Sequence, residues 1–159
     1  MKPEIIKELA LEEGFDLVAL GPADPGPDAA RFLDWIRAGR QGSMDYLAKN
    51  AGRIASSEGF LPAARSVISL GWDYSRDPVE LPGGGLVARY AAGRDYHRAL
   101  GSRLRRLKAR LVDAGSRPDS LRFGVDAVPV LERALAHGAG LGFQAKSGGV
   151  IHPRQGPYL

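Results

Sequence analysis

Residues 121–138 restrict the possible folds most, because a segment with strand character passes directly into one with helix character. Residues 121–125 (Leu-Arg-Phe-Gly-Val) are typical of a short buried strand. Pro129 stands where the first turn of a helix tolerates a residue without an N–H, and Gly138 supplies a stop. A strand followed at once by a helix predicts an α/β chain, in which ligands gather beyond the carboxyl ends of strands.

One carboxylate, Asp126, lies between these two elements. Its spacing leaves two roles open. Aspartate is a preferred N-cap residue, so Asp126 could simply begin the helix that follows. An acid at the end of a strand, with Arg133 further along, could equally have a chemical role.

The rest of the chain continues the alternation of helices and strands. Periodic apolar residues predict helices at residues 3–13, 43–50 and 96–114, and a further helix that is capped by Asp28 and ends near Gly39. Short apolar runs predict strands at residues 15–20, 66–70, 86–90 and 150–151. We therefore expect one α/β domain over residues 1–159, with a mixed sheet of four or five strands flanked by helices.

Composition excludes several classes of function. The 159 residues contain no cysteine, which excludes disulfides, thiolate metal sites, a cysteine nucleophile and iron–sulfur ligation by this chain. The three histidines have no metal-ligand spacing, so no metal site is expected. Charged residues interrupt the first eleven positions, and no apolar run approaches the roughly 20 residues that span a bilayer. We expect a cytoplasmic protein without a membrane partner.

The net charge of +4 is unevenly distributed. Residues 89–122 hold ten basic and three acidic side chains, and many of the basic ones fall in the predicted helix 96–114. Its apolar stripe would be Leu100, Leu104, Leu107 and Leu111. The arginines of this helix form either a solvated face or a surface that contacts a polyanion. The candidates for nucleic-acid contact are Arg98, Arg103, Arg105, Arg106 and Arg110.

Three groups of residues could combine into one site. They are the segment 94–97 (Arg-Asp-Tyr-His), Asp126 with Arg133, and Lys146 within the glycine-dense segment 140–149. Each of them follows a predicted strand or begins a predicted helix, where an α/β sheet exposes functional side chains.

Four segments also carry a family resemblance: residues 42–47, 65–68, 89–97 and 125–133. Together, Gly-Arg-Asp-Tyr-His at 93–97 and Val-Asp-x-x-Pro-Val-Leu-Glu-Arg at 125–133 form a specific pair of motifs. The chain resembles the N-terminal domain of epoxyqueuosine reductases, and the resemblance covers nearly its whole length. That family reduces the epoxide of epoxyqueuosine in the anticodon loop of a tRNA, using cobalamin and two four-iron–four-sulfur clusters.

The resemblance implies roles for individual residues. Asp126 matches the family's proton donor, and the substrate side would be lined by Arg94, Asp95, Tyr96, His97 and Arg133. Cofactor binding would involve Gly140, Gly142, Lys146 and Ser147. Ala145 stands where the family usually has glycine, the residue that lets a backbone approach a ligand most closely.

The family's cluster-binding cysteines lie beyond the segment that the chain matches. We therefore expect a fragment or a shortened relative, which would need a ferredoxin-like domain or a separate redox partner. The sequence is also compatible with two alternatives. One is a non-catalytic module that binds a corrinoid or another tetrapyrrole, and the other is a basic RNA-binding domain without cofactor.

Overall fold

The structure, a computed structural model, describes residues 1–75, 77–126 and 128–158. The first half of the chain contains α1 (Pro3–Glu12), β1 (Leu17–Pro22), α2 (Pro27–Arg37), α3 (Asp45–Lys49), α4 (Ala51–Ile54), η1 (Ser57–Gly59) and β2 (Ser66–Gly71). The second half contains β3 (Val79–Glu80), β4 (Leu86–Val87), η2 (Arg89–Ala91), α5 (Tyr96–Asp113), η3 (Pro118–Ser120), α6 (Glu132–Gly138), β5 (Phe143–Gln144) and β6 (Val150–Ile151).

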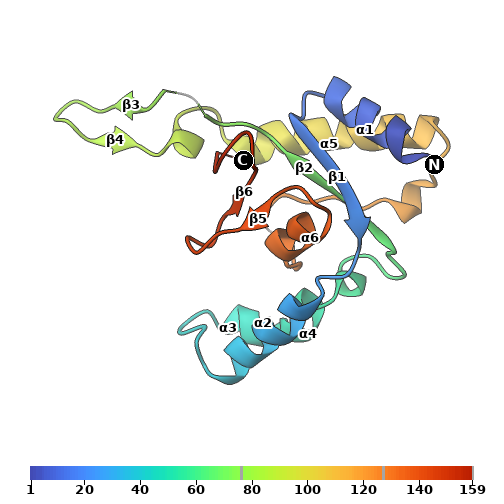
Figure 1. Cartoon of the computed structure of the whole chain (residues 1–159), viewed down its shortest axis with the longest axis horizontal. Helices are drawn as coiled ribbons and strands as arrows, with labels where there is room; N and C mark the ends of the chain where they lie inside the picture. Colours follow the sequence, from blue (N-terminus) through green and yellow to red (C-terminus); the bar gives the residue numbers. More distant parts are fainter. Residues whose placement is uncertain (76, 127, 159) are drawn as a thin grey trace.

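The described strands form three separate antiparallel pairs, so the predicted mixed sheet of four or five strands is wrong, although the α/β class is confirmed. The longest pair joins β1 to β2, with Leu17 opposite Gly71 and Pro22 opposite Ser66 (Figure 1). The pair β3–β4 projects from the body as an arm, and β5–β6 is a hairpin beside α6 (Figure 1).

The segment 121–125, predicted as a strand, is irregular. Two of the hydrogen bonds in this region come from side chains. Lys108 Nζ donates to the Leu121 carbonyl at 2.7 Å, and the Arg122 guanidinium donates to the Phe60 carbonyl at 2.6 Å. The predicted burial is only partly met, because Leu121 and Val125 pack against the core at its edge while Phe123 is 39% exposed. The Leu121 carbonyl is satisfied by a lysine side chain in place of a neighbouring strand.

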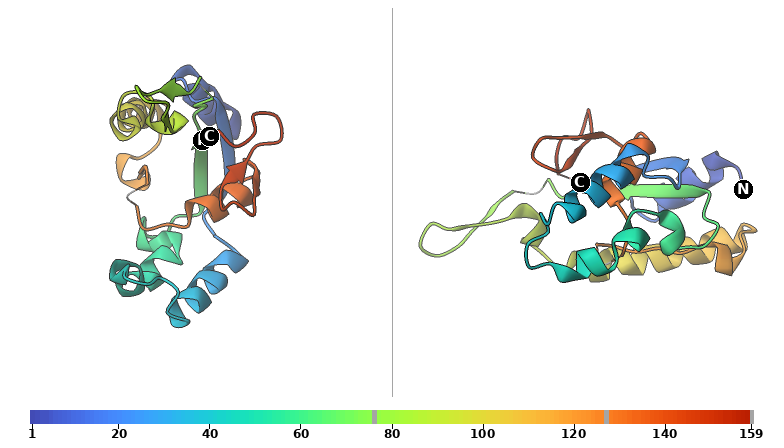
Figure 2. Two further views of the ribbon diagram at one scale, coloured as in Figure 1. Left: turned by 90° about the vertical axis from the view of Figure 1, so that its left-hand side faces the viewer. Right: turned by 90° about the horizontal axis from the view of Figure 1, so that it is seen from below.

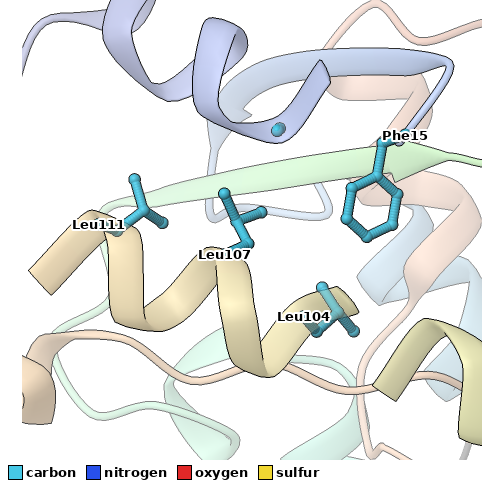
Figure 3. Close-up of a cluster of buried hydrophobic side chains, with 5 residues drawn as sticks. Phe15, Leu104, Leu107 and Leu111 are labelled. Carbon is cyan, nitrogen blue, oxygen red and sulfur yellow. The ribbon is translucent and has the colours of Figure 1, made fainter. Parts of the chain in front are cut away.

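The core lies between α1, α5 and the β1–β2 pair (Figure 3). It consists of Ala10, Phe15, Leu104, Leu107 and Leu111, each at most 9% exposed. Three of the four leucines predicted as a stripe are thus buried, and Leu100 packs against the cluster from its edge.

Three arginines of α5 bind the end of α1 and the turn after it. Arg106 pairs with Glu13 at 2.8 Å, Arg110 pairs with Glu12 and also reaches Glu13 at 3.3 Å, and Arg103 donates to the Gly14 carbonyl. The basic face of α5 therefore contributes in part to packing within the chain.

Helices α2, α3 and α4 gather at the end of the molecule opposite α1 and α5 (Figure 2). The helix α2 begins at Pro27 with Gly26 as its N-cap, so the predicted cap at Asp28 is wrong. Proline is well suited to a first helical position, which places Asp28 inside the first turn.

Among the described residues, no helix combines the length and apolar character needed to cross a membrane.

Gly101 provides a test of how α5 is stabilised. It lies inside this helix, and a Cβ at its position would have open space within 4 Å. Replacing it with alanine is expected to raise the free energy of unfolding by about 0.5–1 kcal/mol, because glycine loses more backbone entropy in a helix than alanine. Urea unfolding would measure the change, and a loss of stability would show that α5 does not tolerate the methyl group.

Candidate active site

Asp126 lies in the loop before α6 with a φ of +53°, a left-handed backbone conformation. The helix α6 begins at Glu132 with Leu131 at the N-cap position, so the interpretation of Asp126 as a helix cap is wrong. Pro129, expected in the first helical turn, precedes the helix instead, and a proline disfavours helical conformation for the residue before it. The Asp126 carboxylate is therefore available for contacts with other parts of the chain.

Those contacts come from the beginning of α5. The Tyr96 hydroxyl donates a hydrogen bond to Asp126 Oδ2, and Nε2 of His97 lies 3.3 Å from the same oxygen. On its other side, Nδ1 of His97 lies 2.9 Å from Oδ1 of Asp95. The structure thus brings together four of the sequence-predicted site residues, in the order Asp95–His97–Asp126–Tyr96.

Asp95 has a second role, as the N-cap of α5 that the sequence predicted. Its Oδ1 also accepts a hydrogen bond from the backbone N–H of His97 at 3.0 Å. The hydrogen bond with the His97 side chain lowers the pKa of Asp95, which keeps this carboxylate ionised. The cap of the longest helix therefore fixes both the backbone and the ring of His97.

Tyr96 acts as a protonated donor. Its hydrogen bond to Asp126 raises the pKa of the phenol to about 12. Its ring stacks on the His97 imidazole at 4.1 Å between centroids, and Tyr90 meets it edge-on at 6.4 Å. The side chains of Asp95, His97 and Asp126 are each about half exposed, so solvent and a ligand can reach all three.

Two hollows meet at Asp126. The larger, about 580 Å³, is bordered mainly by apolar side chains of the core and by the aromatic residues around η2. The smaller, about 320 Å³, lies between the beginnings of α2 and α6 and strand β5. Asp126 and Glu132 line both, Arg94 and Tyr96 line the larger, and Arg133 lines the smaller. Asp126 therefore stands at the junction of a largely apolar space and a polar one.

Glu132 is a site residue that the sequence reasoning missed. Burial raises the pKa of its carboxyl group, and the charge of Asp126 raises it further. Its position next to Arg133 in the motif at 125–133 was the available signal. The raised pKa favours the protonated form of Glu132 next to Asp126.

The residues predicted to bind a cofactor lie on and beside the β5–β6 hairpin, and none of the four lines either hollow within the described part of the chain. Gly140 has a φ of +79° just beyond α6, and a Cβ at Gly142 would come within 2.5 Å of the Ile151 carbonyl oxygen. Local backbone geometry thus accounts for both glycines. Lys146 and Ser147 are exposed at the turn, and Arg133 braces this turn by donating to the Gly148 carbonyl.

The five predicted nucleic-acid contacts fall into two groups. Arg103, Arg106 and Arg110 are engaged with α1 and the turn after it. Arg98 has a side chain that is 92% exposed, and Arg105 is also exposed. These two residues are seven positions apart, about two helical turns, and so share one face of α5.

The sequence model described as "Epoxyqueuosine reductase QueG, DUF1730" matches residues 55–127. The chain is 35% identical to an epoxyqueuosine reductase of Pseudomonas aeruginosa over 160 residues, covering 97% of this chain and 44% of the relative. It is 37% identical to one of Synechococcus sp. (strain CC9605), covering 98% of this chain and 49% of that relative. The chain thus spans less than half the length of these two relatives.

Solved structures of epoxyqueuosine reductases share the fold of this chain. A selenomethionine-labelled epoxyqueuosine reductase superposes with a TM-score of 0.80 at 26% identity, covering 98% of this chain and 42% of the other. An epoxyqueuosine reductase bound to an epoxyqueuosine-modified stem loop of tyrosine tRNA shares the fold, with a TM-score of 0.75 at 23% identity. In sequence and in fold, this chain is similar to the N-terminal part of the epoxyqueuosine reductases.

Proposed function

We propose that this chain forms the substrate- and corrinoid-binding part of an epoxyqueuosine reductase that acts on tRNA, with Asp126 as the acid that protonates the epoxide oxygen. The observation that carries the proposal is the position of Asp126. Its carboxylate is free of any helix cap, is held by Tyr96, faces His97 and borders both hollows.

Opening an epoxide requires a proton for the oxygen, and a positioned acid supplies one. Asp126 is accessible to a ligand, and it lies beside a second acid, Glu132, whose pKa is raised by burial. Tyr96 positions the Asp126 carboxyl group through its hydrogen bond to Oδ2. Asp126 is therefore the group in this arrangement that is best placed to protonate a bound substrate.

The larger hollow is lined by side chains on which an unpaired RNA base could stack. Tyr74, Tyr90 and Tyr96 line it together with Arg89 and Arg94. Proteins read unpaired RNA bases by stacking them on aromatic rings and guanidinium groups. A relative binds an epoxyqueuosine-modified stem loop, and we propose the same class of substrate for this chain.

The hairpin β5–β6 offers the side chains that suit cobalamin. Phe143 is 49% exposed, and Lys146 and Ser147 present donors at the turn of the same hairpin. An exposed aromatic ring with neighbouring donors fits a flat macrocycle that carries amide groups at its edge. When bound, cobalamin would supply the electrons for the reduction. Because the 159 residues lack cysteine, the iron–sulfur ligands would come from a ferredoxin-like domain or a separate redox partner.

A chimeric reductase tests the proposal. In it, this chain replaces the matching part of the Pseudomonas aeruginosa relative, and mass spectrometry of digested tRNA follows epoxyqueuosine and queuosine. Conversion clearly above that of the relative without this part is expected. A folded, cobalamin-loaded chimera that makes no queuosine would contradict the proposal.

Cobalamin binding separates this function from that of a basic RNA-binding domain without cofactor. The isolated chain is expected to bind cobalamin weakly, and Phe143→Ala is expected to weaken binding further because the exposed ring is lost. Equilibrium dialysis with absorbance detection gives the affinity. The matched control is Tyr46→Ala, which removes an aromatic ring that is 61% exposed on α3. No retention of cobalamin at high micromolar protein would exclude the cofactor role.

The exposed residues Arg98 and Arg105 of α5 predict a salt dependence. If Arg98 and Arg105 contact phosphates, tRNA affinity should fall roughly tenfold or more between low and physiological salt. Reversing both charges to glutamate should reduce that slope, because fewer counterions are released on binding. Arg106→Ala should leave the slope unchanged, because this residue already pairs with Glu13. A slope unaffected by the double reversal would make the exposed face of α5 a solvated surface only.

A further inference from the structure

The stoichiometry of the proposed reaction requires more protons than Asp126 can carry. Converting an epoxide to an alkene consumes two electrons and two protons and releases one water molecule. A carboxyl group holds one proton. If the proposed function is right, Asp126 must therefore be reprotonated within one turnover, or a second acid must act beside it.

His97 is the residue whose geometry meets this need. One ring nitrogen, Nε2, lies 3.3 Å from the Asp126 carboxylate, and the other, Nδ1, lies 2.9 Å from Asp95. We propose that His97 supplies the second proton by reprotonating the Asp126 carboxylate, and that Asp95 is the positioning residue that orients the imidazole. This inference rests on the proposed function and adds a residue role that the proposed function does not assign.

The transfer is balanced in atoms and electrons. The Nε2–H bond of a His97 imidazolium breaks, and an O–H bond forms on Oδ2 of Asp126. The imidazole becomes neutral and keeps its Nδ1–H, which donates to Asp95. Solvent then returns a proton to Nε2, since half of the His97 side chain is exposed. The two electrons of the reduction come from a reduced corrinoid, and the transfer itself moves none.

Tyr96 also touches Asp126 but is a poor source of the second proton. With a pKa of about 12, its phenol would have to ionise next to a carboxylate. Its hydrogen bond instead holds Oδ2 of Asp126 within reach of Nε2 of His97. The titratable or charged groups that surround the imidazole are Asp95, Tyr96, Arg98, Asp126 and, beyond Asp126, Glu132.

Asp95 allows a substitution that separates structure from chemistry. Its Oδ1 both caps α5 and accepts from the His97 ring. Asparagine caps a helix about as well as aspartate, so Asp95→Asn retains the cap and one acceptor but removes the negative charge. If Asp95 only stabilises the helix, this variant should behave like the wild type in every assay.

The chimeric reductase provides the kinetic test. His97→Ala is expected to lower kcat about a hundredfold with little change in KM, as for the loss of a proton-transfer group. Imidazole added to the buffer should restore part of the rate of His97→Ala but none of the rate of Asp126→Asn. Asp95→Asn should lower kcat with unchanged thermal stability. Wild-type kcat in His97→Ala, or a loss expressed in KM that imidazole does not restore, would overturn the relay.

Nuclear magnetic resonance on the isolated chain gives a readout that does not depend on activity. The nitrogen chemical shifts of the His97 ring should show the neutral form protonated at Nδ1, and Asp126→Asn should move the Nε2 signal. A ring protonated at Nε2, with no response to Asp126→Asn, would refute the geometry directly. An inactive wild-type chimera would refute the proposed function, whereas an active one with a fully active His97→Ala variant would refute the relay alone.

Discussion

Asp126→Asn is expected to lower the kcat of the chimeric reductase by at least about a hundredfold while leaving the fold intact. The amide cannot deliver a proton at useful acidity, although its oxygen can still accept the hydrogen bond from Tyr96. Asparagine also adopts positive φ values more readily than most residues, so the backbone at +53° remains acceptable. Steady-state turnover and thermal melts on the same preparations measure both parts of the prediction.

Two further substitutions at Asp126 serve as controls. Asp126→Gly should be equally inactive and keep its stability, because glycine adopts this backbone conformation without strain. Asp126→Ala should be inactive and less stable by about 1–2 kcal/mol, because a Cβ without a local hydrogen bond is disfavoured at positive φ. Near-normal turnover of Asp126→Asn would remove Asp126 from the chemistry and with it the central functional assignment.

Local elements could be predicted from the sequence because their signals are local. The apolar period of residues 96–114 and the cap at Asp95 predicted α5 closely, and the strands β1 and β2 were also anticipated. Strand pairing could not be predicted in the same way. The apolar segment 121–125 is compatible with a strand, but the Leu121 carbonyl accepts from the Lys108 side chain, and Arg122 of the segment donates to the distant Phe60 carbonyl. Both contacts depend on the tertiary fold.

The candidate site was predicted in part for a similar reason. Motifs singled out Asp95, Tyr96, His97 and Asp126 as candidates, and the structure brings these four residues together. The cap interpretation of Asp126 failed because a proline can precede a helix as well as begin it, and the sequence alone does not distinguish these positions.

Contacts between distant parts of the chain also could not be predicted from the sequence. The pairing of Arg106 and Arg110 with Glu12 and Glu13 joins residues more than 90 positions apart. Helical spacing could show that these arginines share a helix, but not which of them would meet another helix. Their nucleic-acid role remains a prediction, and the exposed residues Arg98 and Arg105, which lie outside the contact with α1, serve to test it.

The largest effect on stability is expected at Leu107, which is 3% exposed in the core cluster with Phe15, Leu104 and Leu111. Leu107→Ala should lower the free energy of unfolding by about 2–5 kcal/mol, through lost burial and the cavity left behind. The large hollow already borders this residue, so truncation enlarges an existing space. Small domains have total stabilities of about 5–15 kcal/mol, so such a loss removes a large fraction of the stability of the chain.

Leu86→Ala is the matched control for this substitution. It removes the same atoms from β4, where the leucine is 67% exposed, so stability should change by no more than about 0.5 kcal/mol. Urea unfolding followed by circular dichroism compares the two variants with the wild type. If both variants lost the same stability, the α1–α5 cluster would not be the centre of this fold, and the scaffold that holds Asp95, His97 and Asp126 would have to be stabilised elsewhere. A loss confined to Leu107→Ala would instead show that the helix bearing the proposed relay is held in place by its apolar face.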